Sequence, residues 1–320
     1  MTNEHGSATI KAQLGDWRVY EQIDTVFAGT GEHAYFYIEK QGRNSEDVAQ
    51  ELARQLGLPR VAIGYAGKKD RAGITRQWMS AHTPSDRWPE LDGVSCLKAT
   101  RHTQKLKTGA LSRNQFHVML RDCQSLGQDQ LKQLSAGFAN RFGPQRFAGE
   151  NLQQALTWLD SHRRGEGRRN SRARGKRKRS GVSRGQEGWH LSVLRSFLFN
   201  QILEYRSQTI GCERLIDGDF LVYGYPSAPL WGRGRSSAQL DALALERAAL
   251  REHLPICEAL EFTGVAQMRR ALYVRPQGLT VEQVSTDRFR LAFTLPPGAY
   301  ATTMLAHGMR VHDASLKEAA

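Results

Sequence analysis

The sequence predicts an α+β fold, in which strands from both ends of the chain share one sheet and the middle forms an insertion. Three observations support this prediction. The chain has 320 residues, which suits two domains or one domain with a large insertion. Alternating or β-branched segments lie near both ends, and the middle is rich in helical periodicity and basic residues.

The first predicted elements are a strand and a helix. Residues 33–40 (HAYFYIEK) are rich in aromatic and β-branched side chains, which is typical of a strand. A helix follows over residues 45–56, because apolar residues repeat every four positions there. Asn44 or Ser45 can cap its start, and Gly57 ends it.

A charged loop comes after the next predicted strand. Residues 60–65 are typical of a short buried strand, and the cluster Lys68–Arg71 follows Gly67. Charged side chains at the end of a strand are held in place by the sheet, so this loop is a candidate site.

The remaining elements follow from the same periodicities. Apolar residues alternate in two segments and share a helical face in a third, and a fourth segment is also typical of a helix. We expect strands over residues 115–121 and 288–293, a helix over 191–205, and a helix over 242–254 that Pro255 ends.

The charge is concentrated in one segment. The formal net charge is +13, and residues 163–184 hold eleven Lys or Arg residues against one acid, Glu166. A nearly neutral body with one basic segment indicates a tethered arm for a polyanion. Its composition cannot bury enough apolar surface, so we expect residues 163–186 to be disordered without a partner.

Several classes of function are disfavoured by what the sequence lacks. No stretch approaches eighteen apolar residues and residues 1–16 have no apolar core, so we expect neither a membrane segment nor a signal peptide, and a cytoplasmic location. No phosphate loop or dinucleotide fingerprint is present. The cysteines lie far apart and no Cys/His cluster occurs, so we expect neither disulfides nor a metal: Cys96, Cys123, Cys212 and Cys257.

Residue chemistry alone leaves the site open. Asp70 stands between two cations that would keep it ionised as a nucleophile or base, but a solvated turn is the simpler interpretation. Phe116 is a core residue or a stacking platform, and its alternation favours the core. Asn114 is a turn residue or a hydrogen-bonding group. Residues 140–147 (NRFGPQRF) contact phosphates and bases or form an unusual loop.

Seven segments in order resemble one known family, the TruD family of tRNA pseudouridine synthases. The pattern A-G-x-K-D followed by T-x-Q-W is that family's active-site segment. The segments span nearly the whole chain: residues 31–53, 64–80 (GYAGKKDRAGITRQWMS), 113–121 (RNQFHVMLR), 140–152 (NRFGPQRFAGENL), 194–203, 216–220 (IDGDF) and 293–305.

The resemblance implies both architecture and activity. Residues 1–142 and 265–320 would form the catalytic domain, with a mixed, largely antiparallel sheet, and residues 143–264 an inserted α+β TRUD domain. The enzyme would be an isomerase that converts uridine 13 in the D arm of tRNA to pseudouridine. It implies tRNA as partner, with no cofactor and no obligatory protein partner.

The resemblance also assigns roles to residues. Asp70 would be the catalytic carboxylate, and Lys11 the early lysine that pairs with it. Lys69 would face phosphate, and Phe116 would stack on the target base. The remaining substrate-binding residues would be Asn114, Arg146 and Phe147.

Departures from the family pattern leave alternatives open. They fall at Arg113, Ala148, Ala306 and His307, and in the long basic segment, and they affect substrate contacts more than chemistry. One alternative is a non-catalytic RNA-binding protein or chaperone on the same fold. Another is a synthase that acts on a different RNA.

Overall fold

A computed structural model describes residues 6–123, 125–163 and 184–319, which form two units. The core of the predicted basic segment, residues 164–183, lies outside the described residues. Its two ends are helical rather than disordered, because Arg163 ends helix α3 (Asn151–Arg163) and Arg184 begins helix α5 (Arg184–Thr209).

The units divide at different residues from the predicted domains. Unit 1 is residues 1–137 with 275–320, and unit 2 is residues 138–274. The short strands β8 (Phe138–Ala139) and β12 (Tyr273–Val274) explain the difference of five and ten residues. They pair with each other in antiparallel register, so the segment that enters unit 2 and the segment that leaves it both belong to unit 2.

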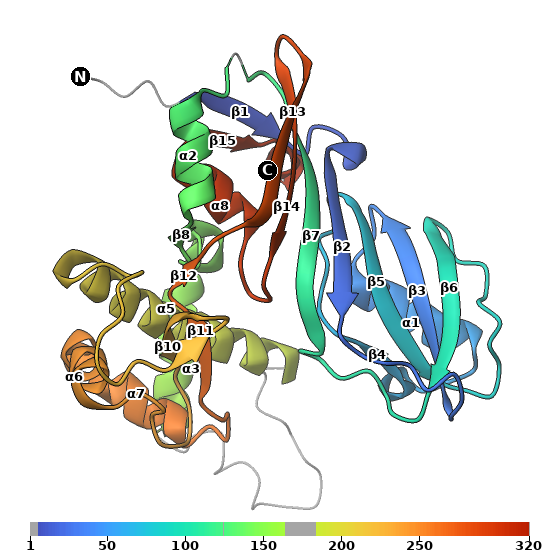
Figure 1. Ribbon diagram of the computed structural model, residues 1–320. Coiled ribbons are helices and arrows are strands. Elements are labelled where there is room, and N and C mark those ends of the chain that lie inside the picture. Colours follow the sequence, from blue (N-terminus) through green and yellow to red (C-terminus); the bar gives the residue numbers. More distant parts are fainter. Residues whose placement is uncertain (1–5, 124, 164–183, 320) are drawn as a thin grey trace, which may run out of the picture. The chain divides into compact units, whose positions relative to one another are not determined.

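Unit 1 contains an eight-stranded sheet in the order β13-β14-β7-β2-β5-β3-β6, with β4 also paired to β5 (Figure 1). Only the β2–β5 pair is parallel, so the predicted mixed and largely antiparallel sheet is confirmed. The strands are β2 (Trp17–Ile23), β3 (His33–Gln41), β4 (Ile63–Tyr65), β5 (Ile74–His82), β6 (Val94–His102), β7 (Leu111–Leu120), β13 (Gln277–Ser285) and β14 (Arg288–Leu295).

The two ends of the described chain meet in unit 1. Strands β1 (Ser7–Ile10) and β15 (Arg310–Asp313) pair in parallel. Helix α2 (Gln128–Ala136) packs against α8 (Ala301–Gly308) so closely that a Cβ at Gly308 would lie 2.9 Å from Leu134. Short 3-10 turns, η1 (Leu14–Asp16) and η5 (Ala314–Ala319), follow β1 and β15.

Helix α1 (Ser45–Gln55) covers one face of β3 and β5. Val48 and Leu52 are buried against the apolar side chains of these strands, which confirms the predicted strand and helix. Gly57 adopts φ 64°, as a helix terminator often does. The strand predicted over residues 60–65 is too long, because Arg60–Ala62 is a 3-10 turn, η2, closed by Ala62 N–H on the Pro59 carbonyl.

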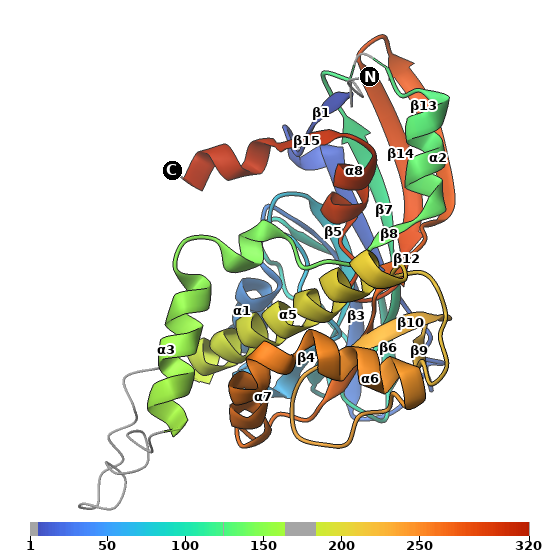
Figure 2. The same cartoon turned by 90° about the vertical axis from the view of Figure 1, so that its left-hand side faces the viewer.

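Unit 2 is a helical layer on a small sheet (Figure 2). Leu194, Leu198 and Ile202 of α5 are buried in its core, as predicted. Pro255 begins a helix instead of ending one, since proline fits the first helical turn, where its missing N–H has no partner. The other elements are α6 (Leu240–Ala249), η4 (Arg251–His253), α7 (Leu254–Glu261), β9 (Leu221–Val222), β10 (Tyr225–Leu230) and β11 (Met268–Ala271).

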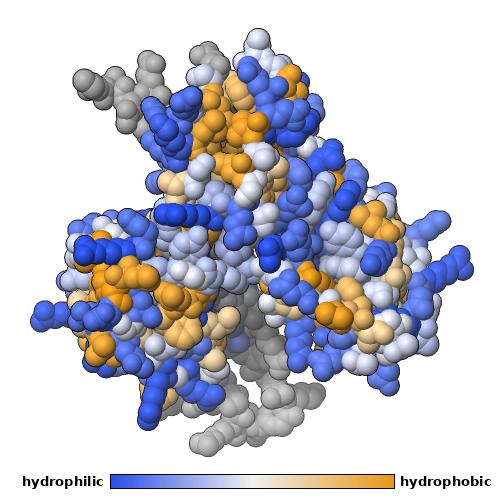
Figure 3. Space-filling view, viewed as in Figure 1, coloured by the Kyte–Doolittle hydropathy of each residue, from blue (hydrophilic) through white to orange (hydrophobic). Residues whose placement is uncertain are grey.

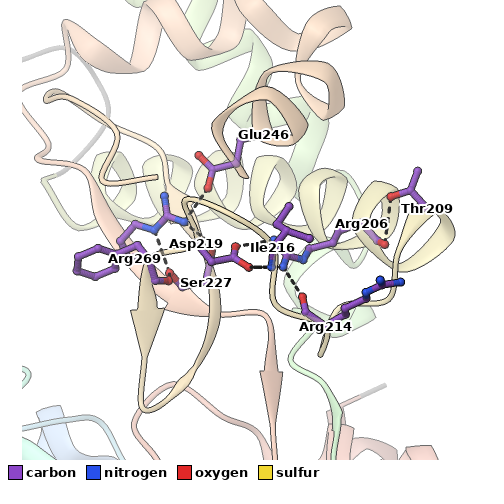
Figure 4. A network of polar contacts seen from close by, with 9 residues as sticks. Arg206, Thr209, Arg214, Ile216, Asp219, Ser227, Glu246 and Arg269 are labelled. Atoms are coloured by element: carbon purple, nitrogen blue, oxygen red, sulfur yellow. Dashed lines mark hydrogen bonds and ion pairs between the residues drawn. The ribbon is translucent and has the colours of Figure 1, made fainter. Parts of the chain in front are cut away.

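Two buried ion pairs stabilise unit 2: one fixes the loop that leads to β9, and the other joins β11 to α6 (Figure 4). Arg206 donates to both oxygens of Asp219 at 2.7 and 2.6 Å, and Asp219 also accepts from the Ile216 N–H. Arg269 donates to Glu246 at 2.6 Å. Both oxygens of each carboxylate are engaged, because Ser236 donates to the other oxygen of Glu246.

The visible surface alternates hydrophilic and hydrophobic areas (Figure 3). Exposed apolar side chains on unit 2 include Leu240 and Phe262. None of the helices in the described residues has the length and apolar character needed to cross a membrane.

Candidate active site

The loop between β4 and β5 carries Asp70, whose side chain is exposed. One of its oxygens, Oδ2, accepts a hydrogen bond from the indole Nε1–H of Trp17 at 3.1 Å. Within the described residues, its other oxygen makes no hydrogen bond. A carboxylate with one oriented and one unengaged oxygen is suited to act as a nucleophile or base.

Lys40 of β3 fixes the backbone of this loop. Its side chain is fully buried, and its ammonium donates to the carbonyl oxygens of Arg43 at 2.5 Å, Asp70 at 2.8 Å and Lys69 at 3.4 Å. Burial lowers the pKa of Lys40 to about 8, although the nearby Asp70 charge opposes that shift. The loop therefore depends on a cation that pairs with carbonyl oxygens.

Ser45 ties the same loop to helix α1. Its hydroxyl accepts the Lys69 N–H at 2.9 Å and donates to Gln77 Oε1 at 2.7 Å. The predicted side-chain cap is absent, because Asn44 occupies the N-cap position without a capping bond and Ser45 is directed toward the loop. Helix α1, β5 and the Asp70 loop are thus joined through one hydroxyl.

Lys69 does not face phosphate, contrary to the prediction. Its ammonium is buried at 2.5 Å from Glu21 Oε2 of β2, and Glu21 Oε1 accepts the backbone N–H of Trp78. Burial raises the pKa of Glu21, and the Lys69 charge partly offsets this. A buried cation in an ion pair is not available to bind RNA phosphate. The Lys69–Glu21 pair instead connects the Asp70 loop to strand β2.

Phe116 and Asn114 lie on the sheet face that also carries Trp17 and Glu21. Phe116 is 6% exposed, stacks on Phe293 of β14 with ring centroids 5.3 Å apart, and meets the edge of the Trp17 ring at 6.1 Å. It is a core residue that also borders the Asp70 site through Trp17. Asn114 Oδ1 is buried without a hydrogen-bond partner in the described chain.

Lys11 pairs with Asp313 of β15 at 2.9 Å, whereas the family resemblance implied a pair with Asp70. Residue 11 follows β1 with φ 56°, and the parallel β1–β15 pairing brings it beside Asp313. Burial disfavours the Asp313 carboxylate, but hydrogen bonds from Ser315 and Lys11 outweigh this and lower its pKa. Lys11 also lies 4.7 Å above the Trp17 ring, so a single side chain separates it from Asp70.

Arg146 and Phe147 belong to unit 2, in turn η3 (Pro144–Phe147). Arg146 donates to the Ser192 hydroxyl and lies over the Trp189 ring at 4.9 Å. Phe147 packs partly buried against the core of that unit. Both therefore have structural contacts within unit 2.

Three residues of this site were missed from the sequence: Trp17, Glu21 and Lys40. Their partners are 53, 48 and 30 positions away along the chain, so no local pattern shows the contacts. Two signals were present, however. Lys40 and Glu21 are charged residues inside otherwise strand-like segments, which is unusual unless each has a partner.

No group of three or more His, Cys, Asp or Glu residues in the described ranges is arranged to hold a metal ion. The site thus consists of the exposed Asp70 carboxylate, the Trp17 indole that donates to it, and the neighbouring β7 residues. On β7, Phe116 stacks on Phe293, and the buried Asn114 Oδ1 has no hydrogen-bond partner in the described chain.

Comparisons with known proteins agree on one fold. The crystal structure described as the putative tRNA pseudouridine synthase D (TruD) from Methanosarcina mazei matches 97% of this chain and 95% of its own, with a TM-score of 0.63 and 17% identity. A likeness at that identity establishes the fold alone. The chain accordingly shares the fold of that structure, in which a mixed-sheet unit is interrupted by a second unit.

Sequence comparisons identify the family. The family model described as tRNA pseudouridine synthase D (TruD) matches residues 1–155. The chain is 35% identical to the tRNA pseudouridine synthase D of Methylococcus capsulatus over 94% of its length and 92% of the relative's. It is 36% identical to that of Cellvibrio japonicus, covering 97% and 92%. The chain belongs to the TruD family of tRNA pseudouridine synthases, and the predicted enzyme class, an isomerase, is confirmed.

Proposed function

We propose that this chain converts uridine 13 in the D arm of tRNA to pseudouridine, with Asp70 as the catalytic carboxylate. The observation that carries the assignment is the exposed Asp70 side chain, which has one oriented and one unengaged oxygen on an immobilised loop. The choice of uridine 13 rests on the resemblance to the family.

The reaction is an isomerisation. The C1′–N1 bond of the uridine breaks, a C1′–C5 bond forms, C5 loses a proton and N1 gains one. Asp70 acts at the sugar, either by attack on C1′ or by removal of the C2′ proton. The detached uracil must be held and shielded from water while it turns.

Two residues of β7 are proposed to hold the base. The unpartnered Asn114 Oδ1 would accept a hydrogen bond from a uracil N–H or a ribose hydroxyl, which would satisfy a buried acceptor. Phe116 would meet the base on the side that Phe293 does not cover. Phe116 is also buried in the core, so stacking and core packing are separated by the measurement below.

The experiment is to incubate the protein with tRNA transcripts and map pseudouridine by chemical derivatisation. We expect modification at position 13, no product when that uridine is replaced by cytidine, and no product with Asp70→Asn. Tight binding without pseudouridine would favour a non-catalytic RNA-binding protein. Pseudouridine at another position would retain the enzyme class and overturn the choice of site.

A separate measurement decides the role of Phe116. We expect Phe116→Leu, which keeps an apolar core residue, to lower the single-turnover rate more than it lowers tRNA affinity. If activity per folded molecule is unchanged and only the melting temperature falls, Phe116 is a core residue without a stacking role.

A further inference from the structure

Trp17 makes an unusual contact for a buried aromatic residue. It is 1% exposed, yet its indole N–H reaches the exposed carboxylate of Asp70 at 3.1 Å. An indole nitrogen only donates, and a buried one normally has an acceptor. In this site, the acceptor is the proposed catalytic group itself.

The Trp17 ring is held on several sides. Phe116 packs against it from β7, and the Lys11 ammonium lies over it at 4.7 Å while paired to Asp313. The backbone is confined too, since a Cβ at Gly73 would lie 2.4 Å from the Trp17 carbonyl oxygen. The chain that leaves the Asp70 loop therefore runs directly against the residue that binds the Asp70 side chain.

Two independent contacts thus define where Asp70 lies. Lys40 fixes its backbone carbonyl at 2.8 Å, and Trp17 fixes one oxygen of its carboxylate. Rotation about the terminal bond of an aspartate is otherwise broad. With Oδ2 bound to the indole, the other oxygen has a defined direction, and catalytic groups act well only within a narrow range of geometry.

We propose that Trp17 is a positioning residue for the reaction: its indole N–H orients the Asp70 carboxylate so that the unengaged oxygen is directed at the sugar. This inference rests on the proposed function of Asp70. The Lys11 ammonium, held by Asp313, packs over the Trp17 ring. Lys11 would therefore act on Asp70 through Trp17 and not through a direct bond.

The test is Trp17→Phe, which keeps an aromatic ring but removes the donor. We expect the single-turnover rate to fall roughly 10- to 100-fold, as for a misplaced reacting group, with the tRNA dissociation constant changed less than about twofold. Trp88→Phe is the matched control. Trp88 meets the Phe36 ring edge-on beside the core cluster of α1, β3 and β5, and its indole nitrogen has no hydrogen-bond partner in the described chain, so its variant loses the same atoms but keeps the rate.

An unchanged rate for Trp17→Phe per folded molecule would overturn the inference. So would a loss of rate equal to the loss in Trp88→Phe, or one explained by weaker tRNA binding. Melting curves correct each rate for the folded fraction, so partial unfolding of a variant does not obscure the result.

A second readout needs no turnover. In ¹⁵N-labelled protein, the indole N–H signal absent from the Trp17→Phe spectrum identifies Trp17. We expect Asp70→Asn to shift that signal and leave the other indole signals in place, because the charged acceptor is lost. An unmoved signal contradicts the contact. If the wild-type protein makes no pseudouridine, the proposed function fails, and this signal still decides whether Trp17 binds Asp70.

Discussion

The loop of Asp70 in unit 1 and the loop of Asp219 in unit 2 both place an acid beside buried cations, and they use it differently. Asp219 is buried, and both its oxygens accept hydrogen bonds from Arg206. Asp70 is exposed, and one oxygen accepts from Trp17. In unit 2 the carboxylate stabilises its own loop, whereas in unit 1 other groups hold the loop and leave the carboxylate available for chemistry.

The supporting ion pairs sharpen the contrast. Lys69–Glu21 and Arg269–Glu246 are both almost completely buried, and burial raises the pKa of each glutamate. The first lies beneath the Asp70 loop, and the second joins β11 to α6 (Figure 4). Two ion pairs of similar burial therefore have different settings: one supports the loop of an exposed carboxylate, and the other joins two elements of the fold.

The largest difference should come from the two aspartates. We expect Asp70→Asn to lower pseudouridine formation by several powers of ten with an unchanged melting temperature, because the amide fits but cannot act as nucleophile or base. Asp219→Asn should lower the melting temperature and leave turnover per folded molecule intact. Single-turnover assays and thermal melting check both. Wild-type turnover in the Asp70 variant would remove the basis of the comparison.

The next largest difference should come from the two buried pairs. Lys69→Met and Arg269→Met each leave a buried glutamate without its cation, which costs about 3–5 kcal/mol in comparable pairs. Urea denaturation measures this loss. We expect turnover per folded molecule to fall only in the Lys69 variant, since its pair supports the Asp70 loop. An equal fall in both variants would show that the Lys69 pair has no special relation to the site.

A smaller effect should appear with pH. Lys40 has a pKa of about 8, below its ordinary 10.5, because it is buried. Between these values the unfolded chain binds a proton that the native protein lacks, so this titration raises the free energy of unfolding as pH rises. Turnover should move the other way, because a neutral amine has two N–H groups for three carbonyl acceptors.

We therefore expect turnover to fall a few-fold as pH rises through about 8, and Lys40→Met to lack this decline while being slower at neutral pH. The pH–rate profiles of the two proteins check it. The Asp219 loop is held by a guanidinium and not by a lysine ammonium, so it should show no matching change. A decline that persists in the Lys40 variant belongs to another group.

The smallest effect on chemistry should come from the basic segment. Its eleven Lys or Arg residues and near lack of aromatic side chains favour contacts with phosphate over contacts with bases. Deleting residues 163–184 should weaken binding to all RNAs similarly and flatten the dependence of affinity on salt, with the same uridine modified. Unchanged affinity and salt dependence would mean that the segment contacts no RNA. A new modified position would mean that it selects the site.

Local sequence patterns predicted the parts of the fold that local physics decides. The strand at residues 33–40, the helix that Gly57 ends and the buried face of α5 follow from periodicity and backbone freedom. Pro255 was misjudged because proline both ends helices and begins them, and only the surrounding packing distinguishes the two.

The site was predicted less completely than the fold. Asp70 stood out through its motif, but its neighbour Lys69 has an opposite environment, buried where Asp70 is exposed. Two adjacent charged residues in a loop look alike in a sequence. Their different environments depend on Glu21, which pairs with Lys69, and on Trp17, which donates to Asp70. Both partners lie on β2, far from the loop in the sequence, so the loop residues alone do not reveal these contacts.

The position of β14 in the sheet has a consequence for how the molecule is made. Strand β7 pairs with β14, and β1 pairs with β15, although both later strands follow all of unit 2 in the sequence. During synthesis from the N-terminus, β7 keeps an open edge while more than a hundred further residues are added. Lys11 meets Asp313 only when residue 313 has left the ribosome. The Lys11–Asp313 contact behind Trp17 therefore forms only after the whole of unit 2 has been synthesised.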